Sequence, residues 1–268
     1  AGYIAAVNAA SSEYTIQVKR DGFLWQQHYQ KGQRQSELEQ VRPLANGEQT
    51  GTAIFFKPDY SIFQVHEFDY DLIYRRLREY AYLLRDLTIV LEDQRASKEK
   101  PPVQFHYPNG LVEFVRSVNR DYQAIHDPIE IIETATVEQK DEPTRYSVDI
   151  EMALQYADIH QPVFLSFVNG LEVRVPDDGT HFVGLISALE RAIHGFGTES
   201  KMLDRDWYSL VKDDIVCGLA VVVSIWHPHA HFEGATKGKL INPEMEEAVY
   251  DVVVQAFEKF SAEHPDQM

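Results

Sequence analysis

The chain has 268 residues and a formal net charge of −17, from 42 Asp and Glu residues against 25 Lys and Arg residues. Its length suggests one or two domains, with two favoured, and a hydrophobic content of 44% is ample for real cores and excludes a disordered chain. Because affinity for nucleic acids rests largely on Lys and Arg that neutralise phosphates, so acidic a chain could touch DNA only through local basic patches. Any role on DNA would therefore be positional or mechanical, with the main grip supplied by other domains or subunits.

The apolar content also bears on the compartment. The longest apolar run, 215–226, is too short to span a bilayer, so we expect a buried strand there and no membrane association. Cys217, the only cysteine, excludes a disulfide framework, fits a reducing cytosol, and is expected to be a small buried side chain. The sequence opens at Ala1 without a methionine or a signal-peptide pattern, so we expect a cytoplasmic fragment of a longer protein.

The first hundred residues predict mixed strands and helices. The expected elements are a short apolar helix end at 4–10, strands at 14–20, 23–30 and 52–56, a helix at 69–86, and a strand at 88–91. Asp21-Gly22 is expected to turn the chain between the first two strands. The stretch 96–102 is polar, charged and broken by prolines, which is typical of a boundary between domains.

A second series of elements follows this boundary. The expected elements are a helix at 111–119, strands at 147–156 and 162–168, a helix that begins after Asp178-Gly179-Thr180-His181, a strand at 218–226, and a helix at 243–260. Asn169-Gly170 is a turn signal, and Thr180 is a plausible N-cap. Both long helices carry an apolar stripe, with positions 182, 185, 186, 189 and 193 in one and 245, 248, 249, 252, 253, 256, 257 and 260 in the other.

A glycine-hinged loop with two lysines, Phe232-Glu233-Gly234-Ala235-Thr236-Lys237-Gly238-Lys239-Leu240, connects the last strand to the last helix. A lysine carries a compact charge on a flexible stem, so it is well suited to grasping a phosphate oxygen. Taken alone, the loop is more typical of an ordinary solvated surface segment than of a phosphate-binding one.

Six short motifs occur in a fixed order along nearly the whole chain. They are Val7-Asn8-Ala9; Thr50-Gly51-Thr52; Phe68-Asp69-Tyr70 with Arg75-Arg76-Leu77-Arg78-Glu79; Phe105-His106-Tyr107 with Gly110; Gly179-Thr180-His181-Phe182-Val183-Gly184; and Glu233-Gly234 with Thr236-Lys237-Gly238-Lys239-Leu240. In this order and spacing the sequence resembles the B-type subunit of a bacterial type IIA DNA topoisomerase, that is, of DNA gyrase or of topoisomerase IV.

The resemblance implies an α/β (α+β) fold. Residues 1–101 would be the C-terminal half of an ATPase domain of the gyrase, heat-shock-90, histidine-kinase and MutL class. Residues 102–268 would be a transducer domain, a βαβ sheet backed by helices. The resemblance further implies that Lys237 reaches the γ-phosphate of ATP, that Thr52 lies in the adenine pocket, and that Gly2 is a remnant of the glycine-rich ATP lid.

The sequence departs from the family pattern around this same chemistry. Ala235 replaces the glutamine that accompanies the phosphate-binding lysine, so one phosphate contact is lost. In Asp213-Asp214-Ile215-Val216-Cys217-Gly218, Val216 and Cys217 replace an arginine and a glutamate. Asp178 replaces one of two glycines, and Ala1 and Tyr3 stand where lid glycines are expected. These changes predict a divergent member of the family whose ATPase could be impaired.

Catalytic residues are expected outside this chain. The resemblance places the general-base glutamate, the magnesium-binding asparagine and the adenine-binding aspartate upstream of residue 1, and the strand-cleavage residues in later domains and in the partner subunit. ATP and magnesium would therefore bind through residues largely outside the chain, and partners would be DNA, the A-type subunit, and a second copy on ATP binding. Asp204-Arg205-Asp206 has the letters of a metal-binding pair, but a solvated turn is expected instead.

His227, His229 and His231 lie outside the family pattern. Alternate residues of an extended segment share a face, so three imidazoles could meet one metal ion, although no cysteine or carboxylate stands at a matching spacing. Titration near neutral pH is the milder alternative for these side chains.

Three interpretations of the whole chain stay open. The first is an energy-transducing part of an ATP-dependent type IIA topoisomerase, with Lys237 as the nucleotide sensor. The second is a non-enzymatic interaction or regulatory protein that retains the fold but is blind to nucleotide, which Ala235, Val216 and Cys217 favour. The third, a MutL or heat-shock-90 relative, is disfavoured by the motifs around Thr180 and Lys237. The sequence does not separate gyrase from topoisomerase IV.

Overall fold

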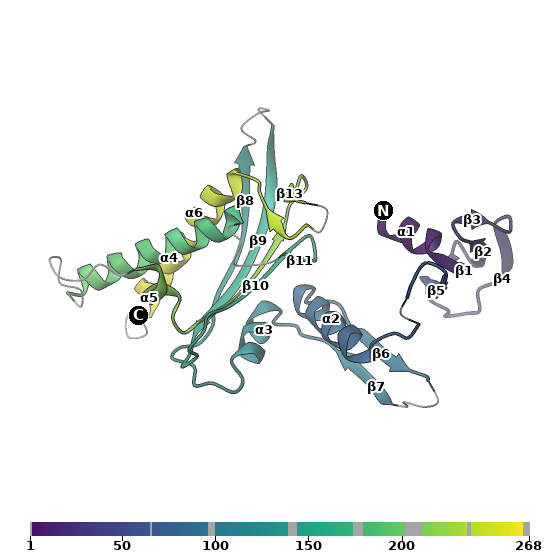
Figure 1. Ribbon diagram of the computed structural model, residues 1–268, viewed down its shortest axis with the longest axis horizontal. Helices are drawn as coiled ribbons and strands as arrows, with labels where there is room; N and C mark the ends of the chain where they lie inside the picture. Colours follow the sequence, from purple (N-terminus) through teal and green to yellow (C-terminus); the bar gives the residue numbers. More distant parts are fainter. Residues whose placement is uncertain are drawn as a thin grey trace. The chain divides into compact units, whose positions relative to one another are not determined.

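The computed structural model describes residues 2–64, 66–95, 100–138, 144–173, 179–201, 211–234 and 237–264. Two compact units make up the chain, Ala1–Tyr70 and Asp71–Met268, and each is described by itself (Figure 1). No helix among the described residues is both long and apolar enough to cross a bilayer.

The first unit is a short helix followed by an antiparallel sheet. Its elements are α1 (Gly2–Ala9), β1 (Ser11–Arg20), β2 (Phe23–Gln30), β3 (Gln33–Arg34), β4 (Glu39–Pro43) and β5 (Gly51–Pro58). The sheet order is β3-β2-β1-β5, and β4 also pairs with β2. Arg20 faces Phe23 across the predicted turn, in which Asp21 and Gly22 both have positive φ, so this hairpin is confirmed. The strands β3 and β4 escaped prediction because they are short and polar.

The second unit contains the larger sheet and the long helices. Its elements are α2 (Tyr70–Leu83), β6 (Ile89–Asp93), β7 (Lys100–Phe105), α3 (Leu111–Val118), β8 (Ile129–Glu138), β9 (Arg145–Tyr156), β10 (Val163–Val168), β11 (Leu171–Val173), α4 (Thr180–Glu199), α5 (Lys212–Val216), β12 (Leu219–Trp226), β13 (Phe232–Glu233), β14 (Lys239–Leu240) and α6 (Glu244–Glu263). The five-stranded sheet has the order β11-β10-β12-β9-β8, in which only the β10–β12 pair is parallel.

Helices cover both faces of this sheet (Figure 1). The helices α4 and α6 pack side by side on one face, where Val221, Val223 and Ile225 of β12 join their core. On the other face, Ala220 and Val222 of the same strand pack with residues of α2 and α3. Burial of both faces explains why β12 is apolar at nearly every position rather than at every second one. The apolar stripes predicted for the two long helices are buried or partly buried in this core and are confirmed.

Three local expectations were wrong. Residues 212–216 form α5 and the strand begins only at Leu219, so Cys217 ends a helix and is exposed rather than buried in a strand. The break is forced at Gly218, whose φ is +79° and where an added Cβ would lie 2.8 Å from the carbonyl oxygen of Ala157. Thr180 is the first residue of α4, and Gly179 is its N-cap without any side-chain capping bond.

The predicted domain boundary at 96–102 also needs correction in its local structure. Residues 96–99 lie outside the described residues, but residues 100–102 begin β7, which pairs with β6 from Ile89–Phe105 to Asp93–Lys100. The prolines are tolerated because this two-stranded sheet leaves each strand one unpaired edge. The compact units divide after Tyr70. The assignment of 1–101 to an ATPase domain and 102–268 to a transducer domain stays a prediction.

Candidate functional site

The lysine loop, residues 232–240, is a small hairpin. Its ends pair as β13 and β14, with Phe232 opposite Leu240 and Glu233 opposite Lys239. The N–H of Lys237 lies 3.4 Å from the carbonyl oxygen of Gly234, and both residues have positive φ, 53° at Lys237 and 72° at Gly234. Ala235 and Thr236 lie outside the described residues. A left-handed backbone is uncommon at a lysine, so the turn holds this residue in a specific conformation.

The two lysines of the loop differ in their surroundings. Lys239 is partly buried, and its ammonium lies 3.8 Å from the carboxylate of Glu233. Lys237 is exposed, and its Nζ lies 5.6 Å from the centre of the Phe232 ring. The aromatic face offers a weak attraction to the ammonium, which orients the stem and leaves the charge at the surface. Lys237 is thus the more accessible of the two cations.

The three histidines that precede the loop do not share a face. The segment 227–231, called the histidine turn below, bends at Pro228 and His229, so His227 is buried while His229 and His231 are exposed. The N–H of His229 donates to Nδ1 of His227 over 3.0 Å, so a bound metal would have to compete with this bond for the nitrogen. The expectation of an extended segment was wrong, and the described residues contain no group of three metal-ligating side chains.

His227 belongs instead to a buried polar network at the start of α6. Its Nε2 lies 3.4 Å from the Tyr146 hydroxyl and 3.5 Å from Oε1 of Glu244. Tyr146 donates to the same carboxylate oxygen over 2.5 Å, and the Asn242 amide donates to it over 2.8 Å. The Glu244 carboxylate is therefore compensated by neutral donors in the first turn of a helix, where a negative charge is favourable.

Titration in this network follows from burial and hydrogen bonding. Burial lowers the pKa of His227, and the Glu244 carboxylate opposes this effect without reversing it. Burial alone would raise the pKa of Glu244, but the bonds from Tyr146 and Asn242 hold it below its usual value. Burial, with the bond to Glu244, raises the pKa of Tyr146. At neutral pH the network therefore contains a neutral imidazole, an intact phenol and one carboxylate.

Thr52 and Gly2, the other predicted nucleotide-binding residues, lie in the first unit. Thr52 is an exposed residue of β5 that faces Val18 of β1, and Gly2 is the first residue of α1. Lys237 lies in the second unit. All three assignments to nucleotide binding stay predictions.

The motif around Thr180 has a structural explanation. His181 is 3% exposed, and its Nε2 lies 2.8 Å from Oγ of Ser166 on the neighbouring strand β10. A Cβ at Gly179 would lie 2.7 Å from the His181 ring, and one at Gly184 would lie 2.2 Å from the carbonyl oxygen of Glu246 in α6. The two glycines therefore allow the helix start and the α4–α6 contact to pack closely. Asp178 lies outside the described residues.

Val216 and Cys217, which replace two charged residues of the family pattern, have structural roles at the end of α5. Val216 is 8% exposed and belongs to the main core, and the Asp214 carboxylate accepts the N–H of Val211 over 3.0 Å. Cys217 is the exposed C-cap of the helix. Asp204-Arg205-Asp206 lies outside the described residues.

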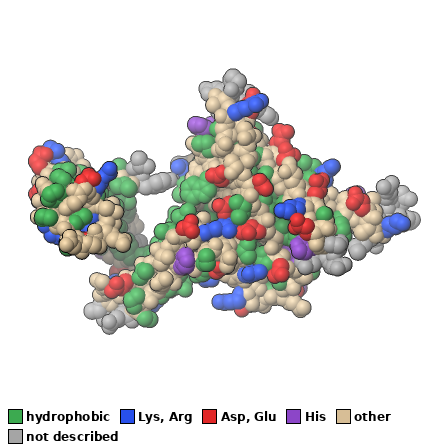
Figure 2. All heavy atoms as spheres, turned by 180° about the vertical axis from the view of Figure 1, so that it is seen from behind, with side chains coloured by type: hydrophobic (Ala, Val, Ile, Leu, Met, Phe, Trp, Pro, Cys, Tyr) green, Lys and Arg blue, Asp and Glu red, His purple; other side chains and the backbone are tan. Residues whose placement is uncertain are grey.

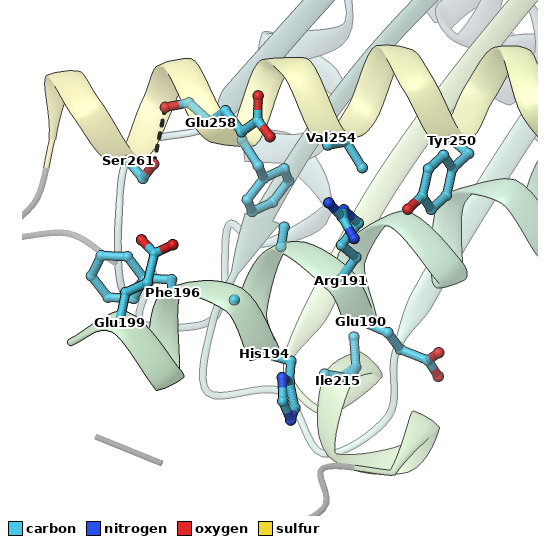
Figure 3. A pocket seen from close by; sticks show the side chains of 13 residues that line it. Glu190, Arg191, His194, Phe196, Glu199, Ile215, Tyr250, Val254, Glu258 and Ser261 are labelled. Carbon is cyan, nitrogen blue, oxygen red and sulfur yellow. Dashed lines mark hydrogen bonds between the residues drawn. The ribbon is translucent and has the colours of Figure 1, made fainter. Parts of the chain in front are cut away.

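A pocket of about 650 Å³ lies between the C-terminal halves of α4 and α6 (Figure 3). Its lining includes Arg191, His194 and Glu199 of α4, Ile215 of α5, and Tyr250 and Glu258 of α6. None of the residues predicted to bind nucleotide lines it. The surface shown in Figure 2 has basic side chains scattered among acidic ones rather than gathered in one patch.

Sequence reasoning missed three residues of the network, namely Tyr146, Asn242 and Glu244. A signal existed for two of them, because Asn-Pro-Glu is a common helix start and the motif directly follows the lysine loop. Tyr146 had no signal, since it lies 96 positions before Asn242 (242 − 146) and only the sheet brings it to the network.

Known proteins match this chain in sequence. The sequence model of the DNA gyrase B family matches residues 110–268. The DNA gyrase B protein of Bacillus mycoides is 35% identical over 264 residues, which are 98% of this chain and 61% of that protein. The DNA gyrase B protein of Haloferax volcanii is 37% identical over 265 residues, again 98% of this chain but 39% of that protein. The chain thus spans less than two thirds of the length of these relatives.

Solved structures match it in fold. The 43K ATPase domain of Thermus thermophilus gyrase B, solved in complex with an aminocoumarin, superimposes with a TM-score of 0.80 at 29% identity, over 97% of this chain and 66% of that one. The gyrase B protein of Myxococcus xanthus gives a TM-score of 0.78 at 24% identity, over 98% and 71%. The predicted fold class and family resemblance are confirmed.

Proposed function

We propose, since the chain belongs to the DNA gyrase B family, that it is part of an ATP-dependent type IIA DNA topoisomerase and couples ATP binding and hydrolysis to DNA strand passage. Lys237 would be the sensor of the γ-phosphate. A terminal phosphate would draw the lysine loop inward, and its loss on hydrolysis would release the loop, which is an ordinary kind of two-state switch.

Lys237 carries the proposal. It is an exposed cation in a left-handed conformation, on a hairpin whose two ends are paired. A non-glycine residue in this region is strained by about 1–3 kcal/mol and persists where the surroundings over-determine it, which is common at ligand-binding sites. Its ammonium offers three donors in one compact charge, as a terminal phosphate requires.

Two residues of this chain would bind the nucleotide, one at each end. Lys237 would hold the terminal phosphate, and the exposed Thr52 hydroxyl would serve a base edge or an ordered water molecule. Among the described residues no group of three His, Cys, Asp or Glu side chains could hold a magnesium ion. ATP would be the substrate whose hydrolysis supplies the free energy, and magnesium would be bound by residues elsewhere in the polypeptide.

Partners follow from the same proposal. They would be DNA, gripped mainly by other domains, the A-type subunit, and a second copy of the chain on ATP binding. The protein would be cytoplasmic.

A nucleotide-blind regulatory protein is the second candidate. Ala235 lacks the donor expected beside Lys237, and Val216 fills core space where the family has a charged residue. The loss at Ala235 would weaken recognition of the terminal phosphate.

Sedimentation of the full gene product, with and without a non-hydrolysable ATP analogue, tests the proposal. We expect the analogue to convert monomer to dimer in the native protein. Lys237→Ala should raise the analogue concentration needed for half conversion by about 10- to 100-fold, because a hydrogen bond to a charged group contributes about 1.5–3 kcal/mol.

Lys239→Ala is the matched control, because it removes the same charge from the same loop at a residue that faces Glu233. It should leave the conversion within about twofold of the native value, as expected for a weak surface pair. Absence of any dimer at millimolar analogue would sink the proposal and favour the nucleotide-blind candidate.

A further inference from the structure

Asn242 occupies the junction between the lysine loop and α6. It is 2% exposed and follows β14 by two residues. Its Oδ1 accepts the N–H of His231 over 2.6 Å, and its Nδ2 donates to the carbonyl oxygen of His229 over 3.1 Å and to Glu244 over 2.8 Å. One side chain therefore links the segment that enters the loop to the helix that leaves it.

The histidine turn is fixed from its other side as well. The Asn169 side chain accepts the N–H of His227 over 2.8 Å and donates to its carbonyl oxygen over 2.9 Å. Because Nδ1 of His227 accepts the N–H of His229, the proton of the neutral ring lies on Nε2, which faces Tyr146 and Glu244. The turn therefore has little freedom to shift against the sheet or against α6.

The residues on either side of the loop are also hydrogen-bonded directly to each other. The N–H of Ile241 donates to the carbonyl oxygen of His231 over 3.0 Å, next to the β13–β14 pairs. The two sides of the hairpin base would therefore move together when Lys237 is displaced. From that base, the side-chain bond from Asn242 to Glu244 continues into α6, beside the bond that the N–H of Met245 donates to the Asn242 carbonyl oxygen over 3.2 Å.

We propose that Asn242 is a positioning residue, which holds the base of the lysine loop in register with α6 so that Lys237 is presented to a terminal phosphate and the contact is transmitted to the helix. This inference rests on the proposed role of Lys237 as a phosphate sensor. Only a side chain with both an acceptor and two donors satisfies all three partners, which an aspartate or a leucine does not. In a buried network a partner left without its bond weakens the whole arrangement.

A double-mutant cycle on the full gene product tests the inference. The measured quantity is the affinity for a non-hydrolysable ATP analogue divided by the affinity for ADP, which lacks the terminal phosphate. Asn242→Ala should lower this ratio by about tenfold and leave ADP affinity unchanged, since the lost bonds act through Lys237. The double variant with Lys237→Ala should then be no worse than Lys237→Ala alone.

Asn119→Ala is the matched control for general destabilisation. Asn119 is also buried, at 4% exposed, and its Nδ2 donates to Gln155 over 3.0 Å in the same unit. It should lower the melting temperature as Asn242→Ala does but leave the ratio unchanged. If Asn242→Ala does not fold, Asn242→Ser, which keeps a small uncharged polar group but cannot reach all three partners, takes its place in the cycle.

The outcomes separate the two proposals. If Lys237→Ala leaves the ratio unchanged, the sensor role itself is refuted. If Lys237→Ala lowers the ratio but Asn242→Ala does not, or if the two losses multiply, only the positioning role of Asn242 is overturned.

Discussion

The two compact units of this chain bury their apolar side chains to very different extents. In the first unit, Tyr14 and Leu24 are the buried apolar residues among those described. In the second unit, two clusters of buried side chains lie on opposite faces of one sheet. Regular strand pairing is present in both units, so hydrogen bonding alone does not distinguish them. The second unit has the larger hydrophobic contribution to its stability.

The strands β5 and β12 show the same difference in side-chain burial between the two units. In β5, Ile54, Phe55 and Phe56 are 41%, 57% and 46% exposed. In β12, Leu219 and Ile225 are fully buried. Both strands are rich in β-branched or aromatic residues, which indicates a strand but does not tell whether another layer covers it.

Truncation of a core side chain gives the largest expected difference between the units. Leu189→Ala in α4, at a fully buried position, should destabilise the second unit by about 2–5 kcal/mol through lost burial and a cavity. Phe55→Ala in β5 should change the stability of the first unit by no more than about 0.5 kcal/mol. Urea unfolding followed by tryptophan fluorescence measures both, since Trp25 is the tryptophan of the first unit. The Trp25→Phe variant isolates the second unit, and the Trp207→Phe, Trp226→Phe double variant isolates the first. A loss of about 2 kcal/mol or more for Phe55→Ala would break the comparison, because it would mean that Phe55 is covered in solution.

The acid sensitivity of the two units should also differ. Burial lowers the pKa of His181 in the second unit to about 4 from 6.5, so the unfolded chain binds the proton first. The contribution of His181 to the free energy of unfolding is therefore fully present above pH 6.5. It is lost as the pH falls toward 4, by about 3 kcal/mol in total. In the first unit, the bond from Lys31 lowers the pKa of Asp59 to about 2 from 3.8, and the bond from Arg42 lowers the pKa of Glu48 from 4.5, so the loss there begins only below about pH 4.5.

Urea unfolding at stepped pH checks this order, again with the Trp25→Phe variant for the second unit. His181→Gln should reduce the slope of its profile between pH 6.5 and 4, because glutamine does not titrate, and the slope that remains should come from His227, whose pKa is also lowered by burial. A profile that keeps its slope in this variant would assign the acid sensitivity to another group.

Prediction of the fold from sequence succeeded where one local pattern decides the element. The hairpin at Asp21-Gly22, the turn at Asn169-Gly170 and the stripe of α6 all follow from spacing and turn chemistry. It failed for β8, whose burial alternates only partly and which is defined by pairing with β9. It also failed at the run 215–226, where the need for positive φ at Gly218 overrides continuous hydrophobicity.

The candidate site was predictable only in its exposed part. Lys237 has a motif around it, but two of the residues that fix the base of its loop, Tyr146 and Asn169, lie on segments distant in sequence. The histidine pattern pointed to a shared face, and the bend at Pro228 removed it. Spacing along a chain predicts a common face only where the segment stays extended.

Replacing a glycine by alanine should give the smallest change in stability, and it compares how closely the backbone is packed in the two units. Gly184→Ala should destabilise the second unit by about 1–3 kcal/mol, because its Cβ would lie 2.2 Å from the Glu246 carbonyl oxygen and must separate α4 from α6. Gly195, in the same helix, has no atom within 4 Å of an added Cβ, so Gly195→Ala should stabilise by about 0.5–1 kcal/mol. Gly51 in the first unit also has no atom within 4 Å of an added Cβ, so Gly51→Ala should not lower the melting temperature. Melting temperatures measure all three variants, and a neutral Gly184→Ala would mean that the helix pair is looser than its close backbone approach implies.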